Sequence, residues 1–173
     1  MLAPWTPSVL AAAMTALSEH YAHGRALAVD DAVVHAAYLG ARVPATYAAV
    51  SATLGMVPPA LLEPIASLLD LGAGPGTASW AAASHCPHVA TVRQVDRSPA
   101  LLALGVRLAS AASLVPPLAI TQVIADLSRP PATPGWPPAD LVLASYVLAE
   151  VPSAAQGACL EAALAAAQRL LVL

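Results

Sequence analysis

The chain has 173 residues, enough for one domain with a substantial hydrophobic core. Hydrophobic residues make up 58% of it, only 10% are charged, and the formal net charge is -3. All seven basic residues are arginine. A dedicated nucleic-acid binder is normally basic, so this composition argues against strong, autonomous affinity for RNA.

The first third of the chain is predicted to be helical. Thr6 followed by Pro7 is a typical helix start, and Gly40 is expected to end the second helix. The expected helices cover residues 7–21, 30–39, 45–54 and 58–63. We therefore predict a helical N-terminal region over 1–64 and a second region over 65–173.

Neither a membrane segment nor an export signal is predicted. The run 43–62 carries no charge, but its three prolines interrupt it too often for a spanning helix. The N-terminus lacks the basic residues of a secretory signal. A cytoplasmic protein without membrane contact is expected.

Basic and potentially basic side chains cluster in the N-terminal region: His20, His23, Arg25, His35 and Arg42. An ordinary solvated surface is favoured over a contact with phosphate, although the second reading stays open. The three histidines lack the spacing and the supporting carboxylate of a metal site, so no metal is expected.

The sequence is organised around a glycine-rich turn. An apolar run over 67–71 leads into Gly72, Gly74 and Gly76, with Asp70 just before the first glycine. Glycines allow a sharp turn and a close backbone approach to a ligand, and the helix that follows offers free N–H groups. The G-x-G-x-G spacing differs from the G-x-G-x-x-G of dinucleotide-binding proteins. Taken alone, the pattern also fits a plain strand-to-helix turn.

Further strand-like runs follow the glycine turn, each with a polar residue near its carboxyl end. They cover 90–96, 123–127 and 139–146, and end near Asp96, Asp126 and Ser145. Helices are expected between them, over 78–84, 98–111 and 154–169. Parallel strands place their carboxyl ends along one sheet edge, so an α/β fold with a ligand site at that edge is predicted.

This series resembles the class I S-adenosylmethionine-dependent methyltransferases, which have a Rossmann-like parallel sheet. The resemblance implies S-adenosylmethionine as the cofactor. The loop 72–76 would hold its methionine part, Asp96 its ribose, and Asp126 with Leu127 its adenine. The cofactor-binding residues expected on this basis are Asp70, Gly72, Ala73, Gly74, Gly76, Thr77, Asp96, Arg97, Asp126, Leu127 and Ser145.

Two strings are similar to a narrower group, the mitochondrial small-ribosomal-subunit methyltransferase-like family and its bacterial relatives. They are R-x-P-A-T-Y-A-A, from Arg42, and A-S-Y-V-L-x-E-V, from Ala144. Members are linked to assembly of the small ribosomal subunit and are described as predicted ribosomal RNA methyltransferases. The resemblance implies Arg42 and Tyr47 as substrate-binding residues, and Ser145 and Tyr146 as residues near the methyl-transfer position.

The methyl acceptor is not fixed by these strings. The Asp/Asn-Pro-Pro-aromatic tetrad of many amino-group methyltransferases is absent, and Ala144-Ser145-Tyr146-Val147 stands in its place. Glu150 is a candidate base, although a glutamate at a helix start more often favours the helix dipole. The alternatives are a non-catalytic assembly factor that retains the fold and, less favoured by the glycine spacing, an NAD-dependent oxidoreductase.

The sequence ends on a fifth apolar strand, expected over 170–173. Class I methyltransferases normally continue with two more strands, and the narrower family carries a cysteine cluster there. An apolar strand at a sheet edge favours pairing. The sequence therefore suggests a C-terminally truncated chain, one completed by a partner, or a dimer.

Overall fold

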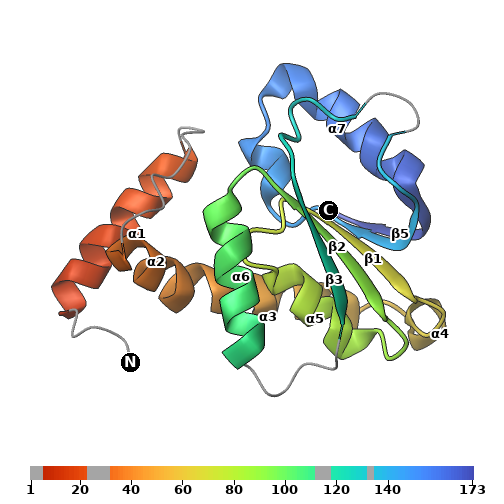
Figure 1. The fold of residues 1–173 in the computed structure, drawn as a ribbon, viewed down its shortest axis with the longest axis horizontal. Coiled ribbons are helices and arrows are strands. Elements are labelled where there is room, and N and C mark those ends of the chain that lie inside the picture. The colour runs from red at the N-terminus through yellow and green to blue at the C-terminus, as the bar shows by residue number, and fades with distance from the viewer. Residues whose placement is uncertain (1–5, 23–31, 112–117, 132–134) are drawn as a thin grey trace.

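A five-stranded parallel sheet forms the centre of the molecule (Figure 1). The computed structural model describes residues 6–22, 32–111, 118–131 and 135–173. The strands are β1 (Ser67–Leu71), β2 (Thr91–Asp96), β3 (Ala119–Ile124), β4 (Ala139–Leu143) and β5 (Ala167–Val172). Their order, β3-β2-β1-β4-β5, confirms the predicted class I methyltransferase fold. The chain reverses its direction of travel between β1 and β4, and such a switch point opens a crevice at the carboxyl edge.

Both faces of the central strands are buried, which explains why their sequences are almost continuously apolar. Leu68 points into a core shared with α3 (Val43–Gly55) and α5 (Thr77–His85). Its neighbour Leu69 points to the other face, where α7 (Ser153–Ala166) packs. Leu69 pairs in register with Arg93 of β2 and Val142 of β4. The small side chains of α5 and α7 let both helices approach the sheet closely.

The N-terminal helices are α1 (Pro7–Ala22), α2 (Ala32–Ala37), the π-helical turn η1 (Tyr38–Arg42) and α3. The predicted break at Gly40 is wrong, because Ala37 and Val43 on either side of η1 keep right-handed helical angles. Pro44 explains the π turn. Its ring would clash with the carbonyl of residue 40 in a regular helix, and the wider turn, in which Val43 N–H donates to the Tyr38 carbonyl, relieves that clash.

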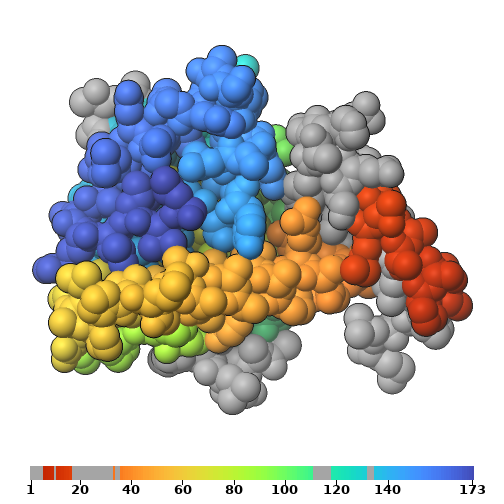
Figure 2. All heavy atoms as spheres, turned by 180° about the vertical axis from the view of Figure 1, so that it is seen from behind, coloured from red at the N-terminus to blue at the C-terminus, as the bar shows by residue number. Residues whose placement is uncertain are grey.

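The last long helix of the N-terminal region, α3, lies along the body of the molecule. Seen from behind, residues of α3 and α4 (Pro59–Leu62) form a continuous band, orange to yellow, below the C-terminal part in blue (Figure 2). Val50 and Leu54 of α3 are buried against the sheet core. No helix in the described segments is long and apolar enough to cross a membrane.

Two predicted strand boundaries are corrected by pairing. The strand expected over 123–127 is β3, which pairs residue by residue with β2 and stops at Ile124, opposite Asp96. Asp126 and Leu127 therefore lie in the loop beyond it. The last helix ends at Ala166 rather than 169, because Ala167 already pairs with Ala139 of β4.

A glycine in α6 (Pro99–Ala111) generates a stability prediction. A Cβ on Gly105 would lie 2.5 Å from the carbonyl oxygen of buried Pro75, in the glycine turn. Gly105→Ala should therefore lower the free energy of unfolding by about 1–3 kcal/mol. Gly157→Ala in α7, where a Cβ meets nothing within 4 Å, should raise it by roughly 0.5–1 kcal/mol. Urea denaturation checks both; equal stability of Gly105→Ala and wild type would contradict the close packing of α6 on the turn.

Candidate functional site

A cleft of about 550 Å³ opens at the carboxyl edge of the sheet. The loops after β1, β2, β3 and β4 line it, together with η1 and the start of α3. Cofactor sites in proteins commonly have volumes of this order. Most residues predicted from the sequence lie in its wall: Arg42, Gly72, Ala73, Gly74, Thr77, Asp96, Arg97, Asp126, Leu127, Ser145 and Tyr146.

The glycine turn forms the floor of the cleft. Gly72 and Gly74 have φ values of 71° and 54°, in the left-handed region where a side chain is strained. A Cβ on Gly72 would collide with Val147, and one on Gly74 would lie 3.0 Å from the Tyr38 hydroxyl. The N–H groups of Gly72 and Ala73 both donate to the Val95 carbonyl, at 2.8 and 3.0 Å, which ties the turn to β2.

Asp96, the last residue of β2, joins the glycine turn to the next loop. Its Oδ2 accepts from the Gly74 N–H at 2.8 Å, and its Oδ1 accepts from the Ser98 N–H at 2.7 Å. Each carboxylate oxygen can accept a second hydrogen bond. The carboxylate therefore shapes the turn and can still accept from two neighbouring hydroxyl groups, as a ribose would present them.

The loop after β3 combines an anion with an apolar wall. The Ser128 N–H donates to Asp126 Oδ1 at 2.9 Å, and this bond, with the Ser128 hydroxyl, lowers the pKa of Asp126. Leu127 is 6% exposed and packs with Trp136 in the core. An apolar surface beside a carboxylate suits a flat heteroaromatic ring that carries an amino group.

The segment after β4 contributes Ser145 and Tyr146. Tyr146 has a φ of 61°, the only positive φ of a non-glycine residue in the described part of the chain, and its side chain is 60% exposed. Strained residues of this kind cluster at functional sites. Ser145 and Tyr146 also line a second hollow of about 290 Å³, which lies between α3 and the ends of β4 and β5. These two residues thus separate the cleft from a neighbouring apolar hollow.

Glu150, a candidate base in the sequence for which a helix-start role was favoured, lines the cleft. Instead of starting a helix, Glu150 ends the 3-10 turn η2 (Val147–Glu150), and its Oε2 lies 3.9 Å from Nη2 of Arg97. Burial raises the pKa of Glu150, with a smaller contribution from Asp96, while Arg97 and Arg42 oppose the rise. The string A-S-Y-V-L-x-E-V contains Glu150 and was the signal available for it.

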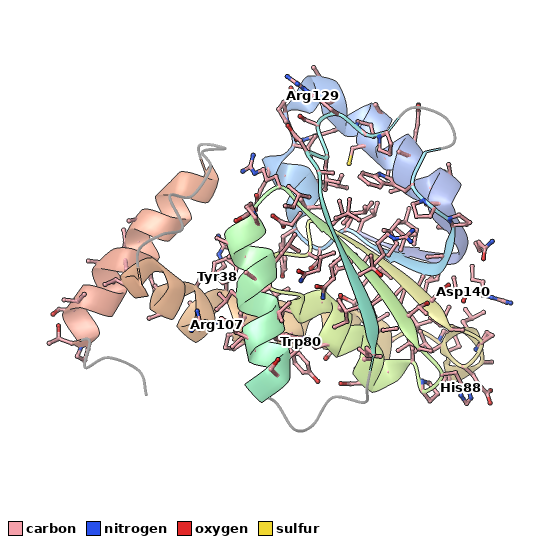
Figure 3. All side chains as sticks on the ribbon, in the orientation of Figure 1. Tyr38, Trp80, His88, Arg107, Arg129 and Asp140 are labelled. Atoms are coloured by element: carbon pink, nitrogen blue, oxygen red, sulfur yellow. The ribbon has the colours of Figure 1, made fainter. Side chains whose placement is uncertain are left out.

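Tyr38 of η1 is a lining residue that was not predicted from the sequence. It packs with α6 through Leu101 and Leu104 (Figure 3), and its hydroxyl closes the cleft above Gly74. The π turn that Pro44 imposes sets the direction of the Tyr38 side chain. No local pattern in the sequence indicated that turn.

Several predicted residues do not line the cleft. Asp70 lies beneath it, 1% exposed, and Gly76 caps α5. Tyr47 is on the α5 side of α3, where its hydroxyl lies 2.9 Å from Ser84 Oγ. His23 and Arg25 lie outside the described residues, as do the side chains of His20 and His35.

Asp70 belongs to a buried polar chain under the glycine turn. Its Oδ2 accepts from Ser79 N–H at 3.1 Å and from Ser79 Oγ at 2.6 Å. Gln94 Nε2 donates to Ser79 Oγ at 3.3 Å, and Gln122 Nε2 donates to Gln94 Oε1 at 3.1 Å. Burial outweighs the bonds from Ser79 and raises the pKa of Asp70 to about 6.

This pKa predicts how stability depends on pH. The folded value of about 6 lies above the ordinary 3.8, so the contribution of Asp70 is fully present below about pH 4 and is lost as the pH rises through 6. Between pH 4.5 and 7 the loss amounts to about 2 kcal/mol. Asp70→Asn should remove that slope in urea unfolding measured at the two pH values.

Asp140 offers a control, because its contribution to stability depends on pH in the opposite direction. Burial would raise its pKa, but hydrogen bonds from Ala66, Ser67 and Arg169 outweigh burial and lower it. Its contribution is therefore present above the unfolded pKa and lost at low pH. Asp140→Asn should lower stability at pH 7 and leave the Asp70 slope in place. A wild-type stability that is flat from pH 4.5 to 7 would contradict the account of Asp70.

The fold is similar to that of solved methyltransferase structures. An O-methyltransferase family protein from Burkholderia thailandensis superposes with a TM-score of 0.68 at 16% identity, over 95% of this chain and 50% of that chain. The magnesium protoporphyrin IX methyltransferase of Synechocystis PCC 6803, solved with bound SAM, superposes with a TM-score of 0.51 at 17% identity, over 92% and 74%. This chain therefore spans half of the first protein and about three quarters of the second.

Among curated protein sequences, none matches the chain. The family described as mitochondrial small ribosomal subunit Rsm22 does match, over residues 32–173. This match confirms the narrower resemblance drawn from the two sequence strings. The chain belongs to the Rsm22 family and has the fold of the class I S-adenosylmethionine-dependent methyltransferases.

Proposed function

We propose that this chain binds S-adenosylmethionine in the cleft and transfers its methyl group to small-subunit ribosomal RNA. The observation that carries the proposal is the placement of Asp96. Its carboxylate holds the glycine turn through Gly74 and the next loop through Ser98, and faces the cleft between them.

The lining residues fit the cofactor in size and in chemistry. A volume of about 550 Å³ admits a nucleoside with an amino-acid side arm. Asp96 would accept from the ribose hydroxyls, and the backbone of Gly72 to Gly74 would lie against the methionine part without a Cβ in the way. Asp126 and Leu127 would contact the amino group and the face of the adenine.

When bound, the cofactor supplies an electrophilic methyl group on a positively charged sulfur. Methyl transfer is a displacement in line with the breaking bond, so the protein's task is mainly to hold donor and acceptor in position. The glycine turn and Asp96, which are fixed to each other, would hold the methyl donor. Ser145 and Tyr146 line both the cleft and the second hollow, where an acceptor would approach.

Membership of the Rsm22 family supports the small ribosomal subunit as partner. The net charge of -3 argues that the chain does not capture free RNA by itself. Binding to a ribosomal particle, in which ribosomal proteins share the contact with the RNA, fits this charge better. Arg42 and Arg97 line the cleft and Arg129 acts on Asp126 beside it, so positive charge lies at the carboxyl edge despite the overall charge of the chain.

A second candidate is a non-catalytic assembly factor that keeps the fold. The observation in its favour is Ala144-Ser145-Tyr146-Val147, which replaces the acceptor tetrad of many amino-group methyltransferases. In this case the carboxyl edge of the sheet would bind the small ribosomal subunit, and the cofactor would be a structural ligand or absent.

Calorimetric titration with S-adenosylmethionine tests the first proposal. Asp96→Asn and Asp96→Ala should weaken binding by about 100-fold, because each loses charge-assisted hydrogen bonds to the ligand and to the turn. Asp140→Asn is the matched control, because Asp140 lies at the amino edge of the sheet (Figure 3), where it is hydrogen-bonded to Ser67 and Arg169. This variant should bind S-adenosylmethionine as wild type does.

The same variants separate the two candidate functions. NADH should not bind, and Asp96 variants that remain folded but bind S-adenosylmethionine as tightly as wild type would contradict the site. Sedimentation with small ribosomal subunits supplies the second readout. Association that persists in Asp96→Ala, without methyl transfer by the wild type, would establish the assembly factor instead.

A further inference from the structure

Three carboxylates line the cleft: Asp96, Asp126 and Glu150. Two of them are fixed by main-chain N–H groups. Asp96 accepts from Gly74 and Ser98, and Asp126 accepts from Ser128. Hydrogen bonds of this kind fix the position of a carboxylate, so these two groups serve to bind.

Glu150 differs from both. In the part of the chain that the structure describes, no donor lies within hydrogen-bond distance of its carboxylate, and the nearest cation, Nη2 of Arg97, is 3.9 Å away. Its side chain is 28% exposed, which leaves it partly desolvated but open to the cleft. η2 carries it on the same short segment as Ser145 and Tyr146, at the rim where the acceptor would approach.

We propose, on the basis of the proposed methyl transfer, that Glu150 is the proton acceptor of the reaction and that the methylated atom carries a hydrogen, as an N–H or O–H group does. This role narrows the possible methyl acceptors to groups that carry a proton. A ring nitrogen with a free lone pair needs no base, whereas an amino, imino or hydroxyl acceptor must lose a proton.

The step balances in atoms and charge. The acceptor atom forms a bond to the methyl carbon while the bond from that carbon to sulfur breaks. The sulfur leaves with the electron pair as a neutral thioether. The acceptor's proton passes to the Glu150 carboxylate, so one positive and one negative charge disappear together. No oxidant, reductant or further reactant is required.

The surroundings of Glu150 suit this role. Burial raises its pKa and Asp96 adds to the rise, while Arg97 and Arg42 keep it from going further. Asp126, Tyr38 and Tyr146 are the other titratable groups among the described residues of the cleft wall. A carboxylate with a raised pKa is a stronger base than one with the ordinary pKa of glutamate.

A titration of the free protein gives a first readout that does not depend on activity. The chain has four glutamates, so carboxyl signals from ¹³C-labelled glutamate are few, and Glu150→Gln assigns one of them. Glu150 should titrate above the ordinary glutamate pKa of 4.5. A Glu150 that titrates at or below that value would overturn the inference, because the cleft would then not create a base.

Methyl transfer to small ribosomal subunits from cells that lack this gene gives the second readout. Transfer is followed in a single turnover at saturating S-adenosylmethionine from pH 5 to 9. The wild-type rate should rise with pH as Glu150 ionises and then level off. Glu150→Gln should lose this dependence and about 100-fold in rate, Glu150→Asp should recover part of it, and Glu161→Gln should match wild type.

The outcomes distinguish this inference from the proposed function. Glu150→Gln that transfers as fast as wild type overturns the inference alone. So does a Glu150→Gln that binds S-adenosylmethionine at least tenfold more weakly but transfers normally at saturation, since Glu150 would then anchor the ligand. A wild-type chain that binds the cofactor and transfers nothing also overturns it. Failure of the wild type to bind S-adenosylmethionine overturns the proposed function itself.

Discussion

The hydrogen bonds of Asp96 are the interactions on which the site depends. The carboxylate connects the glycine turn after β1 to the loop after β2 by hydrogen bonds to both. The register of β1 with β2 sets the position of Asp96 relative to the turn. Charge-assisted bonds of 2.7–2.8 Å are among the stronger contacts available to a side chain. They compensate for the left-handed backbone that the turn requires, and they leave the carboxylate facing the cleft.

The sheet positions the other residues of the site around Asp96. Because all five strands are parallel, their carboxyl ends bring Asp96, Asp126 and Ser145 to one edge from distant parts of the sequence. Underneath, the chain from Gln122 through Gln94 and Ser79 to Asp70 links β3 to β1 across the core. A buried network of this kind fixes a unique arrangement when its members are paired. One oxygen of Asp70 has no partner in the described structure, which is consistent with its raised pKa.

The sequence predicted those features that depend on local pattern. The apolar run and the glycine spacing located β1 and its turn, and the acidic ends of strands indicated Asp96 and Asp126. Features that depend on pairing or on long-range geometry were missed. The end of β3 follows from its register with β2, and the π turn follows from Pro44 acting on residue 40. Glu150 ends a 3-10 turn and lines the cleft, whereas the sequence favoured a helix start for it. Tyr47 shared a string with Arg42, yet helical geometry turns it toward Ser84.

Titration of ¹⁵N-labelled protein with S-adenosylmethionine, followed by NMR, shows whether the ligand binds beside the two anchored carboxylates. We expect saturable shifts of the amide signals of Gly72, Gly74, Ser98 and Ser128, which surround these carboxylates, and little change at Asp140 on the opposite edge. Shifts confined to other surfaces, or none in a folded sample at millimolar ligand, would contradict binding at this site.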